Sequence, residues 1–269
     1  GSGRIHPARC CRAEWEGEFI TSAGSRFATE AKQPFFLFLN YSDAHDPYLP
    51  RTGHIFRADN LGSDVRPIPA YDSEIAYVDS MLGDLLSVLR DTSILDRTIL
   101  VIAADHGEFF GEHGFTNHKV GAYEEVLHVP LLVRHPQSLR VGRIQRAFGL
   151  HEAHRLILDL VENRPVDWVY AKEDDPQVLA QVWGRVTSDD TVAGARSLDP
   201  DANVVYMNSY KLIDRRVGDD ELYDLTTDTK EEHNLLLHRT PEVEALKARM
   251  QVAVNKLPPA RQGTEPDAT

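Results

Sequence analysis

The chain has 269 residues, of which 42% are hydrophobic and 26% charged, an ordinary balance for a globular protein. The formal net charge of -13 argues against nucleic-acid binding by charge alone, because polyanions need a basic footprint. No apolar run is long enough to cross a bilayer and no signal-peptide pattern opens the chain, so the cytoplasm is the default expectation. The cysteines, Cys10 and Cys11, are adjacent, which predicts no disulfide framework and favours a reducing compartment.

The first part of the chain predicts alternating helices and strands. Residues 20–32 have a helix-compatible composition, and the strand formers of residues 35–41 predict a central buried strand. A helix is predicted over residues 71–91, where one apolar stripe recurs at helical spacing, at Ile75, Val78, Leu82, Leu85 and Leu89. Residues 98–104 read as a strand buried on both faces. A glycine-bearing loop and a short strand over residues 129–136 follow.

The second part begins with an amphipathic helix and then changes character. Residues 151–163 complete an α/β pattern, for which we expect a mostly parallel central sheet flanked by helices. The runs "VLAQVWG", "NVVYMNSYKLIDRR" and "DELYDL" then predict a small antiparallel sheet, closed by a charged helix over residues 241–255. We place a domain boundary near Pro165, which gives an α/β domain over residues 1–165 and a small C-terminal subdomain over residues 166–269.

Candidate metal ligands follow the strand in "VIAADHGEFFGEHG". In open α/β sheets ligands collect at the carboxyl ends of the strands, where Asp105 and His106 stand. A carboxylate beside an imidazole can offer two metal ligands. The structural alternative is a turn or capping Asp beside a packed His. Gly107, Gly111 and Gly114 permit tight turns that could bring the loop over an anion.

Three further residues are candidates for binding or catalysis. His118 and Lys119 are adjacent donors, and an ammonium suits a sulfuryl or phosphoryl oxygen, although most lysines are solvated surface groups. His45, just beyond the first predicted strand, can donate to an anionic oxygen or protonate a leaving group; its alternative is a loop histidine bonded to backbone. We interpret His113 as a structural turn residue. Together these groups fit an oxyanion ester bound to a metal, with general-acid assistance.

Five segments follow one another in the order typical of the sulfatase family of the alkaline phosphatase superfamily. They are "PFFLFLNYSDAHDPYLP", "YDSEIAYVDSMLGDLL", "TILVIAADHGEFFGEHG", "HKVGAYEEVLHVPLLVRHP" and "ELYDLTTDTKEEHNLL". The chain resembles this family from about Phe35 to Leu236. The Asp-His-Gly-Glu motif is shared by the wider superfamily, and its combination with the spacing from Lys119 to Tyr123 and with the Leu-Tyr-Asp-Leu segment points to sulfatases. The resemblance implies an alkaline-phosphatase-like α/β fold and a sulfuric ester hydrolase that acts on small-molecule sulfate esters.

The resemblance also implies a role for each candidate. Asp105 and His106 match the late pair of metal ligands, where many sulfatases have Asp-Asn. Lys119 matches the lysine that holds the sulfate ester, and His118 a second contact to it. His45 matches the histidine near the leaving-group oxygen. The implied cofactor is a divalent metal, Ca²⁺ first, with Mn²⁺ or Mg²⁺ as alternatives.

The sequence departs from the family at the nucleophile. Sulfatases have an earlier segment with two Asp ligands and a Cys- or Ser-x-Pro-x-Arg motif whose Cys or Ser becomes formylglycine. Neither Cys10 nor Cys11 has a proline at the matching place, so we expect the middle and C-terminal part of a sulfatase without its nucleophile-bearing N-terminal segment. Two alternatives stay open: a phosphodiesterase or phosphonate monoester hydrolase of the superfamily, and a non-catalytic sulfatase-like module. An edge exposed by missing strands could also favour a homo-oligomer.

Overall fold

A computed structural model describes residues 17–54, 68–118, 121–137, 141–144, 146–170, 177–182 and 201–257. The chain divides into two compact units. The first takes in Gly1–Leu100 and Val133–Leu139, and the second Val101–Leu132 and Arg140–Thr269. The domain boundary near Pro165 stays a prediction.

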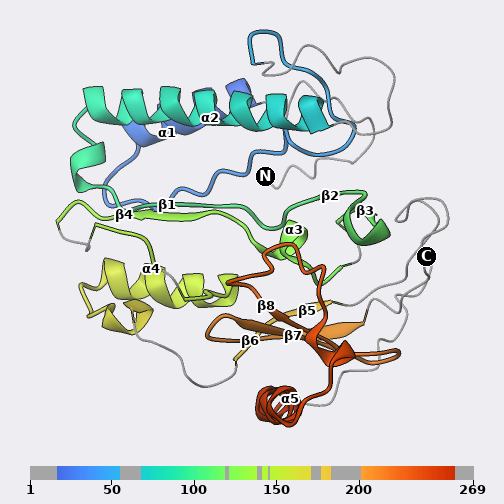
Figure 1. The fold of residues 1–269 in the computed structure, drawn as a ribbon. Coiled ribbons are helices and arrows are strands. Elements are labelled where there is room, and N and C mark those ends of the chain that lie inside the picture. The colour runs from blue at the N-terminus through green and yellow to red at the C-terminus, as the bar shows by residue number, and fades with distance from the viewer. Residues whose placement is uncertain are drawn as a thin grey trace, which may run out of the picture. The chain divides into compact units, whose positions relative to one another are not determined.

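Two long helices pack side by side in the first unit, α1 (Gly17–Glu30) and α2 (Ile68–Asp91) (Figure 1). Both were predicted from their composition and spacing, and both are confirmed. Their shared core contains Ala28, Leu85, Leu89, Ile94 and Leu95, with Phe35, Leu39 and Leu86 packed against it.

The apolar stripe predicted for α2 is right only in its second half. Leu85 and Leu89 are buried, but Ile75 is 45% exposed. In the first half the buried positions are Ala70, Ser73, Glu74 and Tyr77. Polar partners explain this shift, because the loop residue Arg51 donates its backbone N–H to Ser73 Oγ at 2.7 Å and places its Nε 3.7 Å from Glu74 Oε1.

The prediction of a buried central strand over residues 35–41 is wrong in this structure. The segment is extended and its side chains alternate between partly buried and exposed, but it joins none of the ladders of the described residues. Phe35 and Leu39 pack against the helical core, whereas Phe36 and Phe38 are each 76% exposed. The period-2 pattern therefore gives one packed face, and no strand among the described residues pairs with the segment to cover the opposite apolar face.

The strands predicted around residues 98–104 and 129–136 are confirmed as β1 (Leu100–Ala103) and β4 (Leu131–Arg134), which form a two-stranded sheet. The expectation that the first strand is buried on both faces is wrong. Its residues are partly buried, and Ala103 is exposed. A ladder of two strands leaves more side-chain surface open than the middle of a wide parallel sheet would.

A small hairpin and two helices follow in the second unit. β2 (Phe109–Phe110) pairs antiparallel with β3 (Thr116–Asn117) across a one-turn 3-10 helix, Glu112–Gly114. The helices are α3 (Glu124–Leu127) and α4 (Ala153–Val161), the latter within the amphipathic run predicted over residues 151–163.

The predicted C-terminal sheet and its closing helix are confirmed. The strands β5 (Gln177–Val182), β6 (Ala202–Met207), β7 (Tyr210–Arg215) and β8 (Glu221–Asp224) form one antiparallel sheet in that order. The closing helix α5 (Pro241–Val254) packs against one face of the sheet, where it contacts β5, β6 and β7 (Figure 1).

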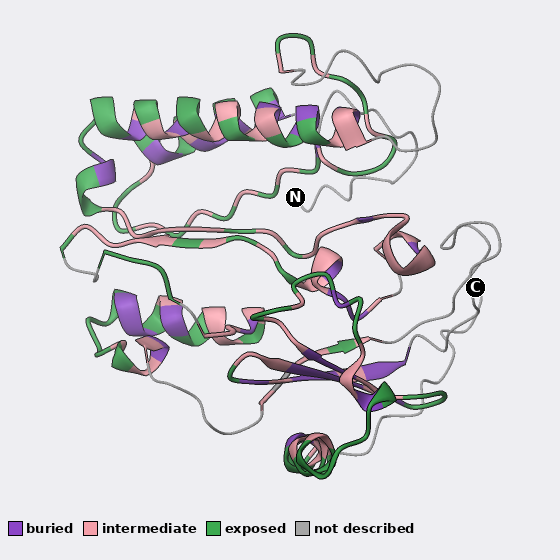
Figure 2. Cartoon of the chain, viewed as in Figure 1, coloured by how far each residue is buried: buried purple, intermediate pink, exposed green. Residues whose placement is uncertain are grey.

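The two faces of this sheet bury different kinds of side chain. The face toward α5 is apolar, with Val205, Leu212 and Leu222 packed around Met250. The opposite face packs Val204 and Ile213 against the hairpin and α3, and the central strands β6 and β7 carry buried residues on both faces (Figure 2). Alternation along the strands also places charged groups on this second face, which are described below. Among the described helices, none combines the length and apolar composition that crossing a bilayer would require.

Arg51→Met tests the polar cluster of the first unit. Arg51 Nη2 lies 3.0 Å from Asp43 Oδ1, and the side chains of Asp43 and Glu74 are fully buried. Removing the guanidinium leaves two buried carboxylates without their cation, so we expect a loss of about 3 kcal/mol in the free energy of unfolding. Denaturant unfolding measures it, with exposed Arg90→Met on α2 as the control. Equal losses in the two variants would contradict this account.

Candidate functional site

The turn after β1 orients two of the predicted residues. Asp105 Oδ1 accepts the backbone N–H of His106 at 3.0 Å, and the Asp105 side chain is 88% exposed. His106 Nδ1 lies 2.8 Å from the Gly107 carbonyl oxygen. A carbonyl oxygen can only accept, so Nδ1 carries the hydrogen and Nε2 keeps its lone pair in the neutral ring. This Nε2 lies 3.7 Å from Asp105 Oδ2. The two atoms can therefore serve one metal ion.

His118 lies directly beside this pair. Its ring stacks on His106 with centroids 3.9 Å apart and an interplanar angle of 20°. Its Nδ1 lies 3.2 Å from Glu108 Oε2, whose side chain is only 5% exposed. The hairpin register explains this contact, because Phe109 pairs with Asn117 and so brings the preceding and following residues together. The structure thus groups Asp105, His106 and His118, and orients His118 through a largely buried carboxylate.

The other two predicted residues are placed differently. His45 is exposed in the first unit, and its Nδ1 lies 2.7 Å from the Asp46 carbonyl oxygen. That contact matches the alternative of a loop histidine bonded to backbone. Lys119 lies outside the described residues. The roles of both residues stay predictions.

Gly107 lets α3 lie close to the backbone of the turn. Its N–H donates to the Val126 carbonyl oxygen at 2.8 Å, and the N–H of Glu108 donates to the Glu125 carbonyl oxygen at 3.1 Å. A Cβ atom at Gly107 would lie 2.0 Å from the Glu125 oxygen. The glycine is therefore required for contact with α3, a reason different from the anion-covering turn that the sequence suggested.

A second cluster contains carboxylates that the sequence did not single out. His113, Glu125 and Glu231 offer ligand atoms within 4.8 Å of one another. His113 has φ +52 within the turn, as a structural turn residue, and stacks on Tyr123 at 3.7 Å. However, Lys211 Nζ lies 2.8 Å from Glu231 Oε1, so an ammonium already supplies positive charge there. We therefore assign no second metal to this cluster.

Burial changes the protonation of groups around α3. The pKa of Glu231 is raised by burial, and Lys211 offsets only part of this effect. Burial also raises the pKa of Tyr206 and of Tyr123, and the adjacent carboxylates of Glu124 and Glu221, respectively, raise them further. Both phenols therefore stay protonated and act as hydrogen-bond donors to those carboxylates.

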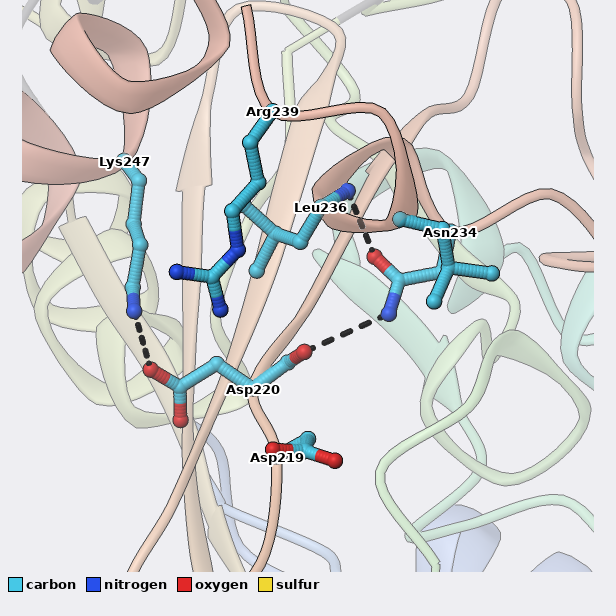
Figure 3. Close-up of a pocket in the computed structure, with 7 residues that line it drawn as sticks. Asp219, Asp220, Asn234, Leu236, Arg239 and Lys247 are labelled. Carbon is cyan, nitrogen blue, oxygen red and sulfur yellow. Dashed lines mark hydrogen bonds and ion pairs between the residues drawn. The ribbon is translucent and has the colours of Figure 1, made fainter.

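A hollow of about 420 Å³ lies elsewhere in the second unit (Figure 3). Both of its basic groups are already paired: Lys247 Nζ lies 2.7 Å from Asp220 Oδ2, and Arg239 Nε lies 3.7 Å from Glu244 Oε1. Asn234 Nδ2 donates to the Asp220 carbonyl oxygen at 3.3 Å (Figure 3). The lining contains none of the predicted site residues; it consists of Asp219, Asp220, Asn234, Leu236, Leu237, Arg239 and Lys247.

Comparison with known proteins identifies the family. The family model described as Sulfatase matches residues 17–161, more than half of the chain. The chain therefore belongs to the sulfatase family, and the resemblance found in its motifs is confirmed.

Individual sulfatases match parts of the chain. Arylsulfatase K of Gallus gallus is 38% identical over 98 residues, which are 36% of this chain and 18% of that protein. A sulfatase of Formosa agariphila is 24% identical over 265 residues, covering 83% of this chain and 50% of that protein. The chain thus spans at most about half the length of these relatives.

Solved structures share the fold. The structure of Ps i-CgsB in complex with k-i-k-neocarrahexaose has a TM-score of 0.60 at 20% identity, covering 88% of this chain and 53% of that chain. The predicted alkaline-phosphatase-like α/β fold with its small antiparallel C-terminal sheet is confirmed.

Gly107→Ala tests the close contact between the turn and α3. The added methyl group would meet the Glu125 carbonyl oxygen, so we expect a loss of about 2 kcal/mol in the free energy of unfolding. Gly83→Ala is the matched control, because a Cβ at Gly83 on α2 meets nothing within 4 Å. That substitution should stabilise the protein by about 0.5 kcal/mol. Thermal unfolding of both variants measures the contrast, and a neutral Gly107→Ala would refute the close approach.

Glu125→Gln tests how much the Glu125 carboxylate contributes to the loss of stability at acidic pH. Burial raises the pKa of Glu125, but His113, a backbone hydrogen bond of Glu125 itself and, last, Lys211 together outweigh it, so the pKa lies below its ordinary 4.5. The folded state therefore favours the carboxylate, which contributes stability above pH 4.5 that is lost as the pH falls through the lowered pKa.

We expect the wild type to lose stability relative to Glu125→Gln as the pH falls from about 6 to about 3. Urea unfolding at several pH values measures this difference, and exposed Glu30→Gln serves as the control. A difference in unfolding free energy that stays constant over this range would contradict the assigned pKa.

Proposed function

We propose that this chain is the middle and C-terminal part of a metal-dependent hydrolase of small-molecule sulfate esters. One observation carries the proposal: in a chain of the sulfatase family, Asp105, His106 and His118 meet at the end of β1, with ligand atoms 3.7 Å apart and stacked rings. Relatives named as arylsulfatase K and N-acetylglucosamine-6-O-sulfatase support a sulfate ester as the substrate class.

Asp105 and His106 would hold the divalent metal. Atoms that are 3.7 Å apart can both lie about 2.4 Å from one ion. Calcium takes about six to eight oxygen ligands, so other groups complete the shell. We propose Ca²⁺ first, as the resemblance to sulfatases implies, with Mn²⁺ or Mg²⁺ as alternatives; of these two, the imidazole nitrogen suits the more borderline Mn²⁺ better. When bound, the metal polarises a sulfate oxygen.

The remaining residues bind the anion and move a proton. Lys119 and His118 would contact sulfate oxygens, and Glu108 keeps the His118 ring oriented. His45 would give a proton to the leaving-group oxygen. The 269 residues contain no Cys- or Ser-x-Pro-x-Arg motif, so we propose that the formylglycine nucleophile belongs to a segment outside this sequence.

A phosphonate monoester or phosphodiester is the second candidate substrate class. His106 stands where many sulfatases have Asn, and the phosphonate monoester hydrolase SpPMH of Silicibacter pomeroyi shares the fold with a TM-score of 0.53 at 21% identity. The family match favours the sulfate ester.

The test is turnover by the complete protein that includes the nucleophile segment. After chelation, aryl sulfate, aryl phosphodiester and phosphonate monoester are each assayed with Ca²⁺ or Mn²⁺ restored. We expect aryl sulfate turnover that needs metal and falls about 100-fold or more in Asp105→Ala. Exposed Asp91→Ala, at the end of α2, is the matched control.

Three outcomes would contradict the proposal. Turnover that needs no metal and persists in Asp105→Ala would show that Asp105 is not a metal ligand on which the reaction depends. Turnover of phosphorus esters alone would favour the second candidate. A complete, folded protein without any esterase activity would indicate a non-catalytic module.

A further inference from the structure

The side chain of Lys211 is fully buried in β7, between two carboxylates. Its Nζ lies 2.8 Å from Glu124 Oε1 and 2.8 Å from Glu231 Oε1. Tyr206 donates its hydroxyl hydrogen to the same Glu124 oxygen at 2.5 Å. A buried ammonium needs such partners, because its transfer out of water is costly. Lys211 therefore fixes the position of the Glu124 side chain.

Glu231 holds the backbone of the same residue. Its Oε2 accepts the N–H of Glu124 at 2.6 Å, at the start of α3. Glu124 is thus held by its side chain and its main chain, in both cases by residues of β6, β7 and the segment after β8. A helix of four residues is too short to be stable by itself, so these contacts determine where α3 lies.

From α3 the constraint passes to the candidate site. The carbonyl oxygens of Glu125 and Val126 accept the N–H groups of Glu108 and Gly107. Those two residues directly follow His106, and the Glu108 carboxylate is bonded to His118. A shift of α3 would therefore move both the metal-ligating turn and the carboxylate that orients His118.

We propose that Lys211 is a positioning residue for the reaction, acting from the C-terminal sheet through Glu124 and α3 on the turn that carries Asp105 and His106. It touches neither metal nor substrate. The turnover part of this inference rests on the proposed function; the structural part does not. A displacement of about 1 Å at a reacting group can reduce turnover about 100-fold.

Lys211→Met removes the ammonium, and Leu212→Ala is the matched control. Leu212 is the next residue of β7, is fully buried, and packs on the opposite face of the sheet with Met250. It should lower the melting temperature without disturbing α3. Tyr206→Phe is a milder second variant, because it removes one hydrogen bond to Glu124 and keeps the ring, so it tests the inference even if Lys211→Met does not fold.

The first readout is amide hydrogen exchange at Gly107 and Glu108, normalised to amides of β6. We expect faster exchange at these two amides in Lys211→Met, a smaller change in Tyr206→Phe, and none specific to them in Leu212→Ala. The second readout is kcat/KM of the complete protein at a temperature where all variants are folded. We expect a loss of about 10-fold or more in Lys211→Met, with Leu212→Ala near the wild type.

The outcomes separate this inference from the proposed function. The positioning role is overturned if Lys211→Met and Tyr206→Phe match Leu212→Ala in both readouts. It is also overturned if the amides of Gly107 and Glu108 exchange faster in these two variants while kcat/KM is unchanged. If the wild type hydrolyses no ester, the proposed function fails, while the exchange comparison still decides whether Lys211 holds the turn.

Discussion

A buried ammonium holds together the part of the chain in which the candidate site is built. Lys211 bridges Glu124 and Glu231, and one lysine cannot neutralise two carboxylates completely. The raised pKa of Glu231 reflects this imbalance, since burial is only partly offset by the lysine. The hydroxyl of Tyr206 and the N–H of Glu124 supply the further donors that make the arrangement tolerable.

A second attachment acts beside the first. Tyr123 donates to Glu221 at 2.8 Å, and Arg215 Nη2 lies 3.2 Å from the Tyr123 hydroxyl oxygen. The consecutive residues Tyr123 and Glu124 are thus tied to three strands of the same sheet, β6, β7 and β8. Two separated attachments restrict rotation as well as translation, so the C-terminal sheet can define the orientation of α3.

The sequence predicted the elements well because their signals are local. Alternation of apolar residues located β6 to β8, and helical spacing located α2. The predictions that failed depend on tertiary contacts. Ile75 fits an apolar stripe but is exposed, because Arg51 draws Glu74 and Ser73 inward instead. Residues 35–41 have the composition of a strand, but a strand also needs a partner, which composition cannot report.

In the candidate site, too, the local features were predictable from the sequence and the long-range contacts were not. Motif order identified Asp105, His106 and His118. The hairpin register explains why His118 lies beside Asp105 and His106. Nothing in the local pattern linked the Tyr-Glu-Glu segment to Lys211, which is 87 residues from Glu124. Long-range ion pairs of this kind depend on which face of a strand meets which helix, and a single sequence does not specify that pairing.

The turn that carries Asp105 and His106, the proposed metal ligands, is supported on one side and exposed on the other. Beneath it, the backbone of Gly107 and Glu108 is bonded to α3, whereas Asp105 is 88% exposed. An exposed carboxylate avoids the desolvation cost that a buried, unpaired charge would carry. It can also meet ligands contributed from elsewhere without repacking a core. A pair of donors held rigidly from below and open above is therefore suited to supplying two ligands of a larger coordination shell rather than to enclosing an ion alone.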